Sequence, residues 1–518
     1  MEEKASPNMQ PLPVGIQTFR DLRAGNFLYV DKTEQIYPLI EHSKGIYFLS
    51  RPRRFGKSLT LSVLDEIFSG NKEIFKGLWI YESKWQWKKY PVLRFDFSKQ
   101  KANDKEELIR FIFRELDLNA KRHQVKLEAV EYFSQFEELI QKVSQTQPVV
   151  ILIDEYDKPI IDHIESTEKA LEMREIMKGF FTVLKGSDPS IRFLLLTGVS
   201  KFSRAGVFSN LNHLRDITLE DEFSDLVGIT EVELESNFKE HIQSLADKEG
   251  LIFTETINKI REWYNGYRFT PQGISVYNPF STLLLLTQKR FEHHWFETGT
   301  PEFLVKLILK GDFDIIEIPF KTEALGFSNY EVDDLNLAPL LVQTGYLTIK
   351  EFDPITQNYT LDYPNYEVKH AFLNYFFRKI HKKNIATSPA IKLHSAFLEE
   401  DLEGVINVIQ DIFASVEYDI QIRNEKYYQT IFYLIFNLLG YYIKTEVKTN
   451  RGRIDAVVES KSIYIFEFKL NGTKEEALRQ IKEKKYYEKY ISLGKPIYLV
   501  GAEFRDKNMG EYLVERME

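Results

Sequence analysis

The sequence contains no cysteine, which excludes disulfide bonds and every metal site that needs a thiolate ligand. A cysteine-free chain suits a reducing compartment, so we expect a cytoplasmic location. Histidine is also scarce, and the ten histidines form no pair on one helix face at the spacing of metal ligands. Any metal in this protein is therefore expected to have oxygen ligands.

Long hydrophobic runs are missing as well. The longest apolar stretch, residues 430–443, is interrupted by Asn437 and Gly440 and is too short to cross a bilayer. The first residues are polar and then rich in proline, which does not resemble a signal peptide. We expect no membrane partner.

The chain also lacks an excess of positive charge, since its formal net charge is −9. This balance argues against a protein coated in basic residues, but it leaves room for one basic cleft that binds nucleic acid. With 518 residues, 43% hydrophobic and 14% aromatic, the chain is expected to fold into two to four globular domains.

The first chemical signal lies in residues 45–61. An apolar run ends in a turn, after which Gly56, Lys57 and Ser58 open a helical pattern, so the order is strand, phosphate loop, helix. Arg51 stands where the general phosphate-loop pattern has its first glycine. Amide groups at the helix start would face the β-phosphate, Lys57 would reach the β- and γ-phosphates, and Ser58 would complete the Mg²⁺ shell. The simpler alternative is a basic loop that leads into a helix. The residues expected at the nucleotide are Arg53, Arg54, Phe55, Gly56, Lys57, Ser58 and Leu59.

A second signal follows about a hundred residues later. Residues 148–153 form a continuous apolar run typical of a strand buried in a parallel sheet, and this run ends in Asp154 and Glu155. Asp154 is placed to hold Mg²⁺ through water, and Glu155 to orient or deprotonate an attacking water. A further strand over 192–196 ends in Thr197, whose hydroxyl could sense the γ-phosphate. The alternative is a core strand followed by an ordinary polar loop.

The last hundred residues predict a second site on two paired strands. Side chains alternate between the two faces of a β-strand, so Glu467 and Lys469, two residues apart, lie on the same face. A three-residue loop centred on Lys461 would put Asp455 directly opposite Glu467, whereas a two-residue loop would send the two carboxylates to opposite faces. Such a carboxylate pair can hold Mg²⁺ or Mn²⁺, and Lys469 can orient water and stabilise the phosphorus centre. An exposed hairpin with outward charges is the alternative.

Four runs together resemble the bacterial AAA-ATPase-like family. They are Tyr29-Val-Asp-Lys-Thr33, Arg51-Pro-Arg-Arg-Phe-Gly-Lys-Ser58, Ile153-Asp-Glu-Tyr-Asp157 and Thr197-Gly-Val-Ser-Lys-Phe202. In that family they precede a nuclease domain of the PD-(D/E)XK superfamily, and an arginine at position 51 looks like the family's own form of the loop. Asp455, Glu467 and Lys469 resemble the nuclease signature, and Gln480 resembles the glutamine of its following helix.

The expected fold class is α/β, with a P-loop NTPase (a parallel sheet with helices on both faces), a helical lid, a connecting region and a restriction-endonuclease-like α/β domain. The expected boundaries are a loose tail at 1–12, the AAA-like ATPase core at 13–225, the lid at 226–290, the connecting region at 291–390 and the nuclease-like domain at 391–518.

The expected function couples ATP binding and hydrolysis to metal-dependent phosphodiester cleavage of nucleic acid, with DNA as the expected substrate. The expected catalytic residues are Glu155, Asp455, Glu467, Lys469 and Gln480, and the expected metal ligands are Ser58, Asp154, Asp455 and Glu467. Two alternatives stay open: a nucleotide-switched binding protein with an inactive nuclease-like domain, and an ATPase that acts on nucleic acid without cutting it. An arginine supplied by a neighbouring copy would require a homo-oligomer.

Overall fold

The structure is a computed structural model. It describes residues 9–201, 208, 211, 213–295, 318–323, 337–380, 389–414, 425–440, 444–450, 453–469, 472–505 and 508–517. For residues 379–380, 425–429, 444–450, 453–455, 504–505 and 508 it describes the backbone alone. The chain divides into two compact units, Met1–Phe313 with Pro319–Val368, and Asp314–Ile318 with Lys369–Glu518. The expected connecting region is therefore shared between the two units.

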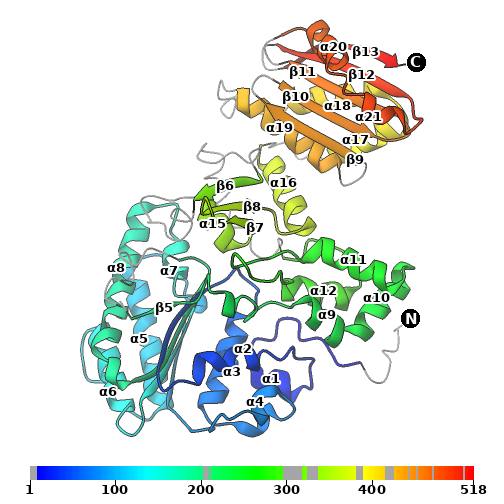
Figure 1. Cartoon of the computed structure of the whole chain (residues 1–518). Coiled ribbons are helices and arrows are strands. Elements are labelled where there is room, and N and C mark those ends of the chain that lie inside the picture. The colour runs from blue at the N-terminus through cyan, green and yellow to red at the C-terminus, as the bar shows by residue number, and fades with distance from the viewer. Residues whose placement is uncertain are drawn as a thin grey trace. The chain divides into compact units, whose positions relative to one another are not determined.

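The first unit is built on a five-stranded parallel sheet with the order β2-β3-β4-β1-β5 (Figure 1). Strands β1, β3 and β4 are buried along their whole length, as their continuous apolar sequences predict for the centre of a parallel sheet. The strands are β1 (Gly45–Ser50), β2 (Val92–Asp96), β3 (Val149–Asp154), β4 (Ile191–Gly198) and β5 (Arg215–Asp216). The parallel sheet predicted from the sequence is confirmed.

Helices flank this sheet on both sides in Figure 1. They are α1 (Phe19–Ala24), α2 (Thr33–Ile40), α3 (Lys57–Phe68), α4 (Trp79–Glu82), α5 (Lys105–Arg122), α6 (Tyr132–Val143), α7 (Lys158–Ile161) and α8 (Thr167–Gly186). A break in the helical structure separates α5 from α6. The break follows His123, where Gln124 adopts φ +56°, a left-handed conformation that ends a helix.

The expected lid segment forms a helical cluster. Its helices are α9 (Glu231–Asn237), α10 (Lys239–Glu249), α11 (Phe253–Tyr264) and α12 (Pro279–Gln288). A capping box begins α9, with Thr230 and Glu233 each bonding the other's backbone amide. Tyr264 and Tyr277, two aromatic turn residues of this segment, are buried in its hydrophobic core.

A small antiparallel sheet follows, with the order β6-β8-β7. Its elements are β6 (Phe320–Glu323), α15 (Leu337–Thr344), β7 (Thr348–Asp353) and β8 (Asn358–Asp362). The turn after α15 touches the phosphate loop, because a Cβ added to Gly345 would lie 2.9 Å from Cβ of Pro52. Helix α16 (Tyr366–Ile380) then begins in the first unit, and its residues from Lys369 onward belong to the second.

The second unit is a five-stranded sheet with the order β13-β12-β11-β10-β9, in which only β11 and β12 run parallel. Its elements are α17 (Pro389–Leu398), α18 (Leu402–Ala414), α19 (Glu425–Leu439), β9 (Lys444–Asn450), β10 (Arg453–Glu459), β11 (Ile463–Lys469), α20 (Lys474–Glu483), α21 (Glu488–Ile491), β12 (Ile497–Arg505) and β13 (Asn508–Met517). Alternate residues of β11 pack on different helices: Ile465 faces the cluster that contains Ile481 of α20, and Phe468 contacts Phe432 of α19. Within the described residues, no helix is long and apolar enough to cross a membrane.

Candidate functional sites

The phosphate loop turns sharply before α3. Gly56 has φ +97°, a conformation that favours glycine, and it directly precedes the first helical residue, Lys57. Arg54 also has a positive φ, +68°. This turn leaves the amide groups at the start of α3 facing away from the helix, where they and the helix dipole favour an anion.

Arg51, at the position of the missing glycine, is 1% exposed and ties the loop to distant parts of the chain. Its guanidinium donates to the carbonyls of Ser50 and Thr218 and to that of Phe223, at 2.8 to 3.0 Å, and it stacks over the ring of Phe269. Burial lowers the pKa of Arg51 to about 9. The side chain is engaged in holding the loop, so it leaves the phosphate side of the loop clear.

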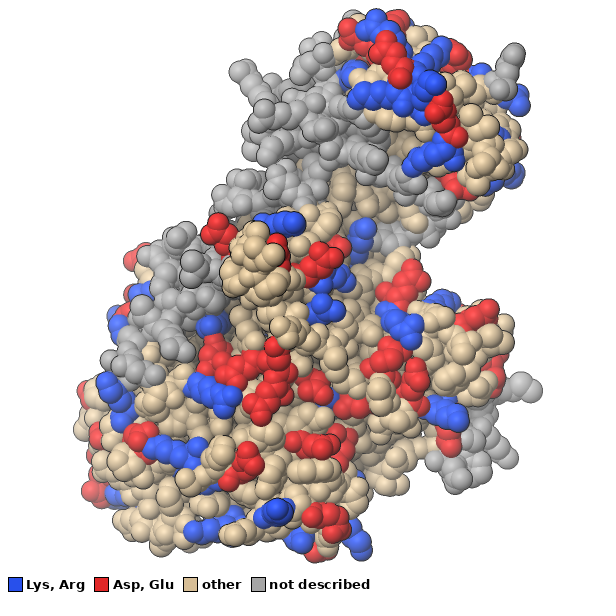
Figure 2. All heavy atoms as spheres, in the orientation of Figure 1, with Lys and Arg blue, Asp and Glu red and all other residues tan. Residues whose placement is uncertain are grey.

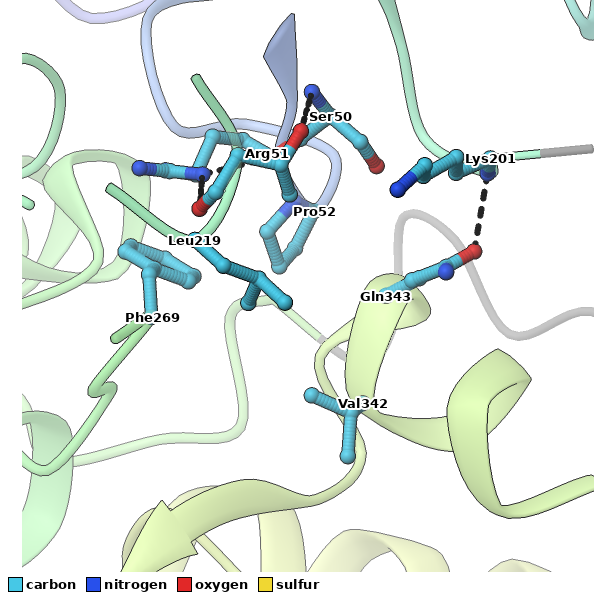
Figure 3. A pocket seen from close by; sticks show the side chains of 9 residues that line it. Ser50, Arg51, Pro52, Lys201, Leu219, Phe269, Val342 and Gln343 are labelled. Carbon is cyan, nitrogen blue, oxygen red and sulfur yellow. Dashed lines mark hydrogen bonds between the residues drawn. The ribbon is translucent and has the colours of Figure 1, made fainter. Parts of the chain in front are cut away.

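Behind the loop lies a small pocket lined by Ser50, Arg51 and Pro52 together with Lys201 and Gln343 (Figure 3). The backbone amide of Lys201 donates to the Gln343 side chain at 2.9 Å, and the Lys201 ammonium pairs with Asp216 at 2.5 Å. Helix α15 is thereby fixed to the segment that follows β4. The contacts of Lys201 with Gln343 and Asp216 therefore support the phosphate loop from behind.

Lys57 is 5% exposed, and its ammonium donates to the carbonyls of Arg51 and Pro52, both at 2.9 Å. Burial lowers the pKa of Lys57, while the charges of Glu155 and Asp154 oppose this shift. The lysine thus lies folded onto its own loop, close to the carboxylates that follow β3.

The carboxylates after β3 have distinct surroundings. Asp154 is 2% exposed and accepts a hydrogen bond from the Thr197 hydroxyl at 2.8 Å. Glu155 adopts φ +50°, a left-handed conformation that is uncommon for glutamate, and burial raises its pKa although Lys57 acts in the opposite direction. The Thr197 hydroxyl is therefore directed to Asp154.

Asp157 is the last residue of the run 153–157, and the sequence alone predicted no role for it. Its carboxylate accepts the backbone amides of Val199 and Ser200, at 3.0 and 2.6 Å, and burial raises its pKa. Gly198 makes room for it, since a Cβ there would lie 2.6 Å from Asp157 Oδ1. Asp157 fixes the chain that leaves β4.

A cavity of about 370 Å³ lies over the start of α3. The expected loop residues line it with the exception of Phe55, which is buried, and Glu155 lines it from β3. Asp154 and Thr197 are buried outside its wall. The sequence missed Lys158, Phe280 and the segment 13–17, which also line this cavity. Lys158 follows the recognised run directly, so its position just after the carboxylates was an available signal.

A second, more apolar cavity of about 100 Å³ shares Gly56, Leu59 and Pro279 with the first. The residues lining it include Tyr29, Val30, Phe55, Leu226, Ile229 and Phe238. Lys32 also lines it, and its ammonium donates to the carbonyl of Asp225 at 2.9 Å and to Glu233 at 2.7 Å. Its walls come from residues before the phosphate loop, from the loop with the start of α3, and from the segment 226–283. No local sequence pattern connects these parts of the chain.

In the second unit the register prediction is confirmed. The backbone of Asp455 pairs with that of Glu467, and the turn spans three residues between Glu459 and Ile463. The side chain of Asp455 lies outside the described part of the chain. Glu467 is fully buried, and the Lys469 ammonium lies 3.4 Å from its Oε1.

Helix α20 brings Gln480 to this pair. Its start is a capping box, in which Thr473 accepts the amide of Glu476 at 3.2 Å and Glu476 accepts that of Thr473 at 3.0 Å. The Lys469 ammonium donates to the Gln480 side-chain oxygen. The structure therefore brings Glu467, Lys469 and Gln480 together as the sequence predicts.

Glu503 is a residue of this region that the sequence analysis missed. It stands beside Lys469 in the register of β11 and β12, is 3% exposed, and accepts the amide of Lys474 at 3.3 Å. A carboxylate at the end of an apolar strand was the available signal, the same one that marked Asp154.

Comparison with known proteins agrees with this division of the chain. The sequence model of the predicted AAA-ATPase family (AAA-ATPase-like) matches residues 13–208, and that of the PD-(D/E)XK nuclease superfamily matches residues 423–511. A protein of Azotobacter chroococcum mcd 1, described as an uncharacterized protein in the vnfD 5′ region, is 39% identical over 511 residues. That alignment covers 95% of this chain and 96% of the relative.

Proposed function

The chain belongs to the family of predicted AAA-ATPases that carry a C-terminal domain of the PD-(D/E)XK nuclease superfamily, and on that basis we propose that it uses ATP to control the cleavage of nucleic acid. ATP is bound and hydrolysed in the first unit, and a phosphodiester, expected to be that of DNA, is cut in the second. The observation that carries the proposal is that the start of α3 and the strained Glu155 face one cavity of about 370 Å³.

The triphosphate binds at the start of α3, where amide groups and the helix dipole favour its charge. Lys57 exchanges its two carbonyl acceptors for phosphate oxygens, which are stronger acceptors because they are charged. Arg53, Arg54 and Lys158 add positive charge to the cavity wall. Glu155, with its raised pKa, orients the attacking water and takes up its proton.

The smaller apolar cavity accommodates the base. It adjoins the phosphate cavity through Gly56 and Leu59, and the residues facing it, such as Tyr29 and Ile229, suit a flat aromatic ring. Because its walls come from both the core and the lid, a bound base would hold the lid segment to the core.

The residues beside Glu155 fit a magnesium ion bound with the nucleotide. Asp154 is a buried carboxylate and Ser58 supplies a hydroxyl, and oxygen ligands of this kind suit Mg²⁺. When bound, Mg²⁺ supplies positive charge that offsets the charge developing on the phosphates. Thr197 holds Asp154 in position through its hydrogen bond, so we assign it a positioning role.

The second unit fits a nuclease centre in the same way. Glu467 is a fully buried carboxylate whose Oε1 lies 3.4 Å from the Lys469 ammonium, and the backbone of Asp455 lies opposite. Mg²⁺ or Mn²⁺ held by Asp455 and Glu467 would supply a Lewis acid for the phosphate. Lys469, oriented by Gln480, places the attacking water and stabilises the negative charge on phosphorus.

One observation favours the alternative, a nucleotide-switched binding protein with an inactive nuclease-like domain. Lysines along and after α20 are paired with glutamates: Lys474 with Glu511, Lys482 with Glu515, and Lys485 with Glu488. Figure 2 shows positive and negative side chains interspersed over the described surface of the second unit. Such pairing leaves this helix face less suited to a phosphate backbone.

The deciding experiment measures cleavage of labelled DNA and RNA, single- and double-stranded, with Mg²⁺ or Mn²⁺ and with or without ATP. It compares the wild type with Asp455→Ala and Lys57→Ala. We expect cleavage that is lost in Asp455→Ala and that responds to ATP only when Lys57 is present. ATP binding without cleavage of any substrate by the wild type would favour the switch instead.

A further inference from the structure

Glu367 is a fully buried carboxylate in the first unit, outside both cavities. It is the second residue of α16, and its two oxygens accept separate hydrogen bonds. The backbone amide of Trp295 donates to Oε1 at 2.7 Å, and the hydroxyl of Ser281 donates to Oε2 at 2.8 Å. Burying a carboxylate among neutral donors is costly, so its presence at this position calls for a function.

Both donor residues, Trp295 and Ser281, are connected to residues that line the proposed nucleotide cavity. The indole of Trp295 donates to the carbonyl of Arg53 in the phosphate loop at 3.1 Å. Ser281 follows Phe280, which lines the cavity and carries the guanidinium of Arg54 over its ring at 4.6 Å. The two oxygens of the Glu367 carboxylate are thus linked, through Trp295 and through Ser281 and Phe280, to Arg53 and Arg54 of the loop.

The helix that Glu367 begins leads out of the first unit. Asn365 caps it by accepting the amide of Val368 at 3.1 Å, and α16 continues to Ile380, with its residues from Lys369 onward in the second unit. A change at the start of α16 therefore acts on the chain segment that connects the two units.

We propose that Glu367 is a positioning residue that couples the phosphate loop to α16, so that nucleotide in the cavity and order at the start of α16 favour each other. The proposal rests on the assignment of the cavity to ATP. A phosphate bound by Arg53 and Arg54 restrains the peptide that accepts the Trp295 indole and the ring beside Ser281. Both of these groups connect to the Glu367 carboxylate, so binding of the phosphate should stabilise the start of α16. Because thermodynamic coupling is reciprocal, order at the start of α16 should strengthen nucleotide binding by the same factor.

The test compares the full-length wild type with Glu367→Gln and Trp295→Phe. Each variant keeps most of the side-chain volume, and neither residue lines the cavity. Glu115→Gln, at another buried carboxylate of the first unit, and Trp85→Phe, at a half-buried tryptophan, are the matched controls. Two quantities are measured: the affinity for the non-hydrolysable analogue AMP-PNP, and amide hydrogen exchange in residues 369–378 with and without it.

In the wild type we expect AMP-PNP to slow exchange in residues 369–378 by about threefold or more. That response should be lost in Glu367→Gln and Trp295→Phe, whose affinity for AMP-PNP should fall about fivefold, and it should persist in both controls. Should Glu367→Gln fail to fold, Ser281→Ala removes a single donor and is read in the same way. A wild type that binds AMP-PNP without any change in α16, or an equal response in all variants, overturns the coupling and leaves the ATP site standing. A wild type that binds no AMP-PNP overturns the ATP assignment and the coupling with it.

Discussion

The hydroxyl of Thr197, at the end of β4, donates a hydrogen bond of 2.8 Å to Oδ1 of Asp154, at the end of the neighbouring strand β3. This bond orients a buried carboxylate beside the catalytic candidate Glu155. It also gives a structural reason for a hydroxyl side chain at the end of this buried strand.

Thr197→Val removes the donor and keeps the shape of the side chain. We expect the turnover number for ATP to fall about tenfold with little change in KM, because Asp154 loses its orientation. Unfolding free energy should fall by about 1–2 kcal/mol, since a buried acceptor loses its partner. Steady-state hydrolysis and urea unfolding measure the two effects. Thr182→Val, at an exposed helical position, is the control. Unchanged turnover in Thr197→Val would mean that Asp154 needs no such support.

Arg51 provides a test of the loop's unusual first position. Arg51→Ala leaves the carbonyls of Thr218 and Phe223 buried without this donor, and we expect a loss of about 3 kcal/mol in unfolding free energy. The control is Arg20→Ala at an exposed ion pair with Glu66, which should cost less than about 1 kcal/mol. Denaturant unfolding gives both values. If Arg51→Ala were as stable as the wild type and bound ATP more tightly, Arg51 would not stabilise the loop. Its side chain would instead hinder ATP binding at a position where other phosphate loops have glycine.

Glu367 predicts a pH dependence of stability. Burial raises the pKa of Glu367 from its ordinary 4.5 to about 8, in surroundings that include the phenols of Tyr264 and Tyr267. A carboxyl whose pKa is higher in the folded state favours folding below the unfolded pKa, and this contribution is lost as the pH rises through the folded value. Relative to Glu367→Gln, the wild type should therefore lose stability between about pH 4.5 and pH 8, by on the order of 4 kcal/mol.

Urea unfolding of both proteins at several pH values gives this difference directly, because other titrating groups are common to the pair. A difference that stays constant between pH 5 and pH 8 would show that the Glu367 carboxyl is already charged at pH 5.

The parts that the sequence predicts correctly depend on rules that act over a few residues. The Asp455 and Glu467 register follows from side-chain alternation and turn length, and the start of α20 follows from Thr473 and Glu476. The glycine before Lys57 has the conformation that a phosphate loop needs. These features need no knowledge of the rest of the chain.

The parts that the sequence misses depend on contacts between distant segments. Arg51 finds its acceptors 167 and 172 residues away, and Trp295 bonds Arg53 across 242 residues. No periodicity or spacing connects such positions, so the loop sequence alone does not reveal the structural role of Arg51. The same reason hides Glu367, which looks from the sequence like one more charge in the first turn of a helix.

Variants of the Lys469–Glu467 ion pair can distinguish its contribution to folding stability from its contribution to cleavage in the second unit. Lys469→Met removes the ion pair described for a fully buried carboxylate, and we expect a loss of about 3 kcal/mol in unfolding free energy. The double variant Lys469→Met/Glu467→Gln carries no buried charge at these positions, so it should recover most of that loss. Cleavage should be absent from Lys469→Met, from Glu467→Gln and from the double variant, because the chemistry needs both groups. A double-mutant cycle by denaturant unfolding, run beside the cleavage assay, measures both. A double variant as unstable as Lys469→Met would show that lost packing of the lysine stem, and not the loss of this ion pair, causes the instability.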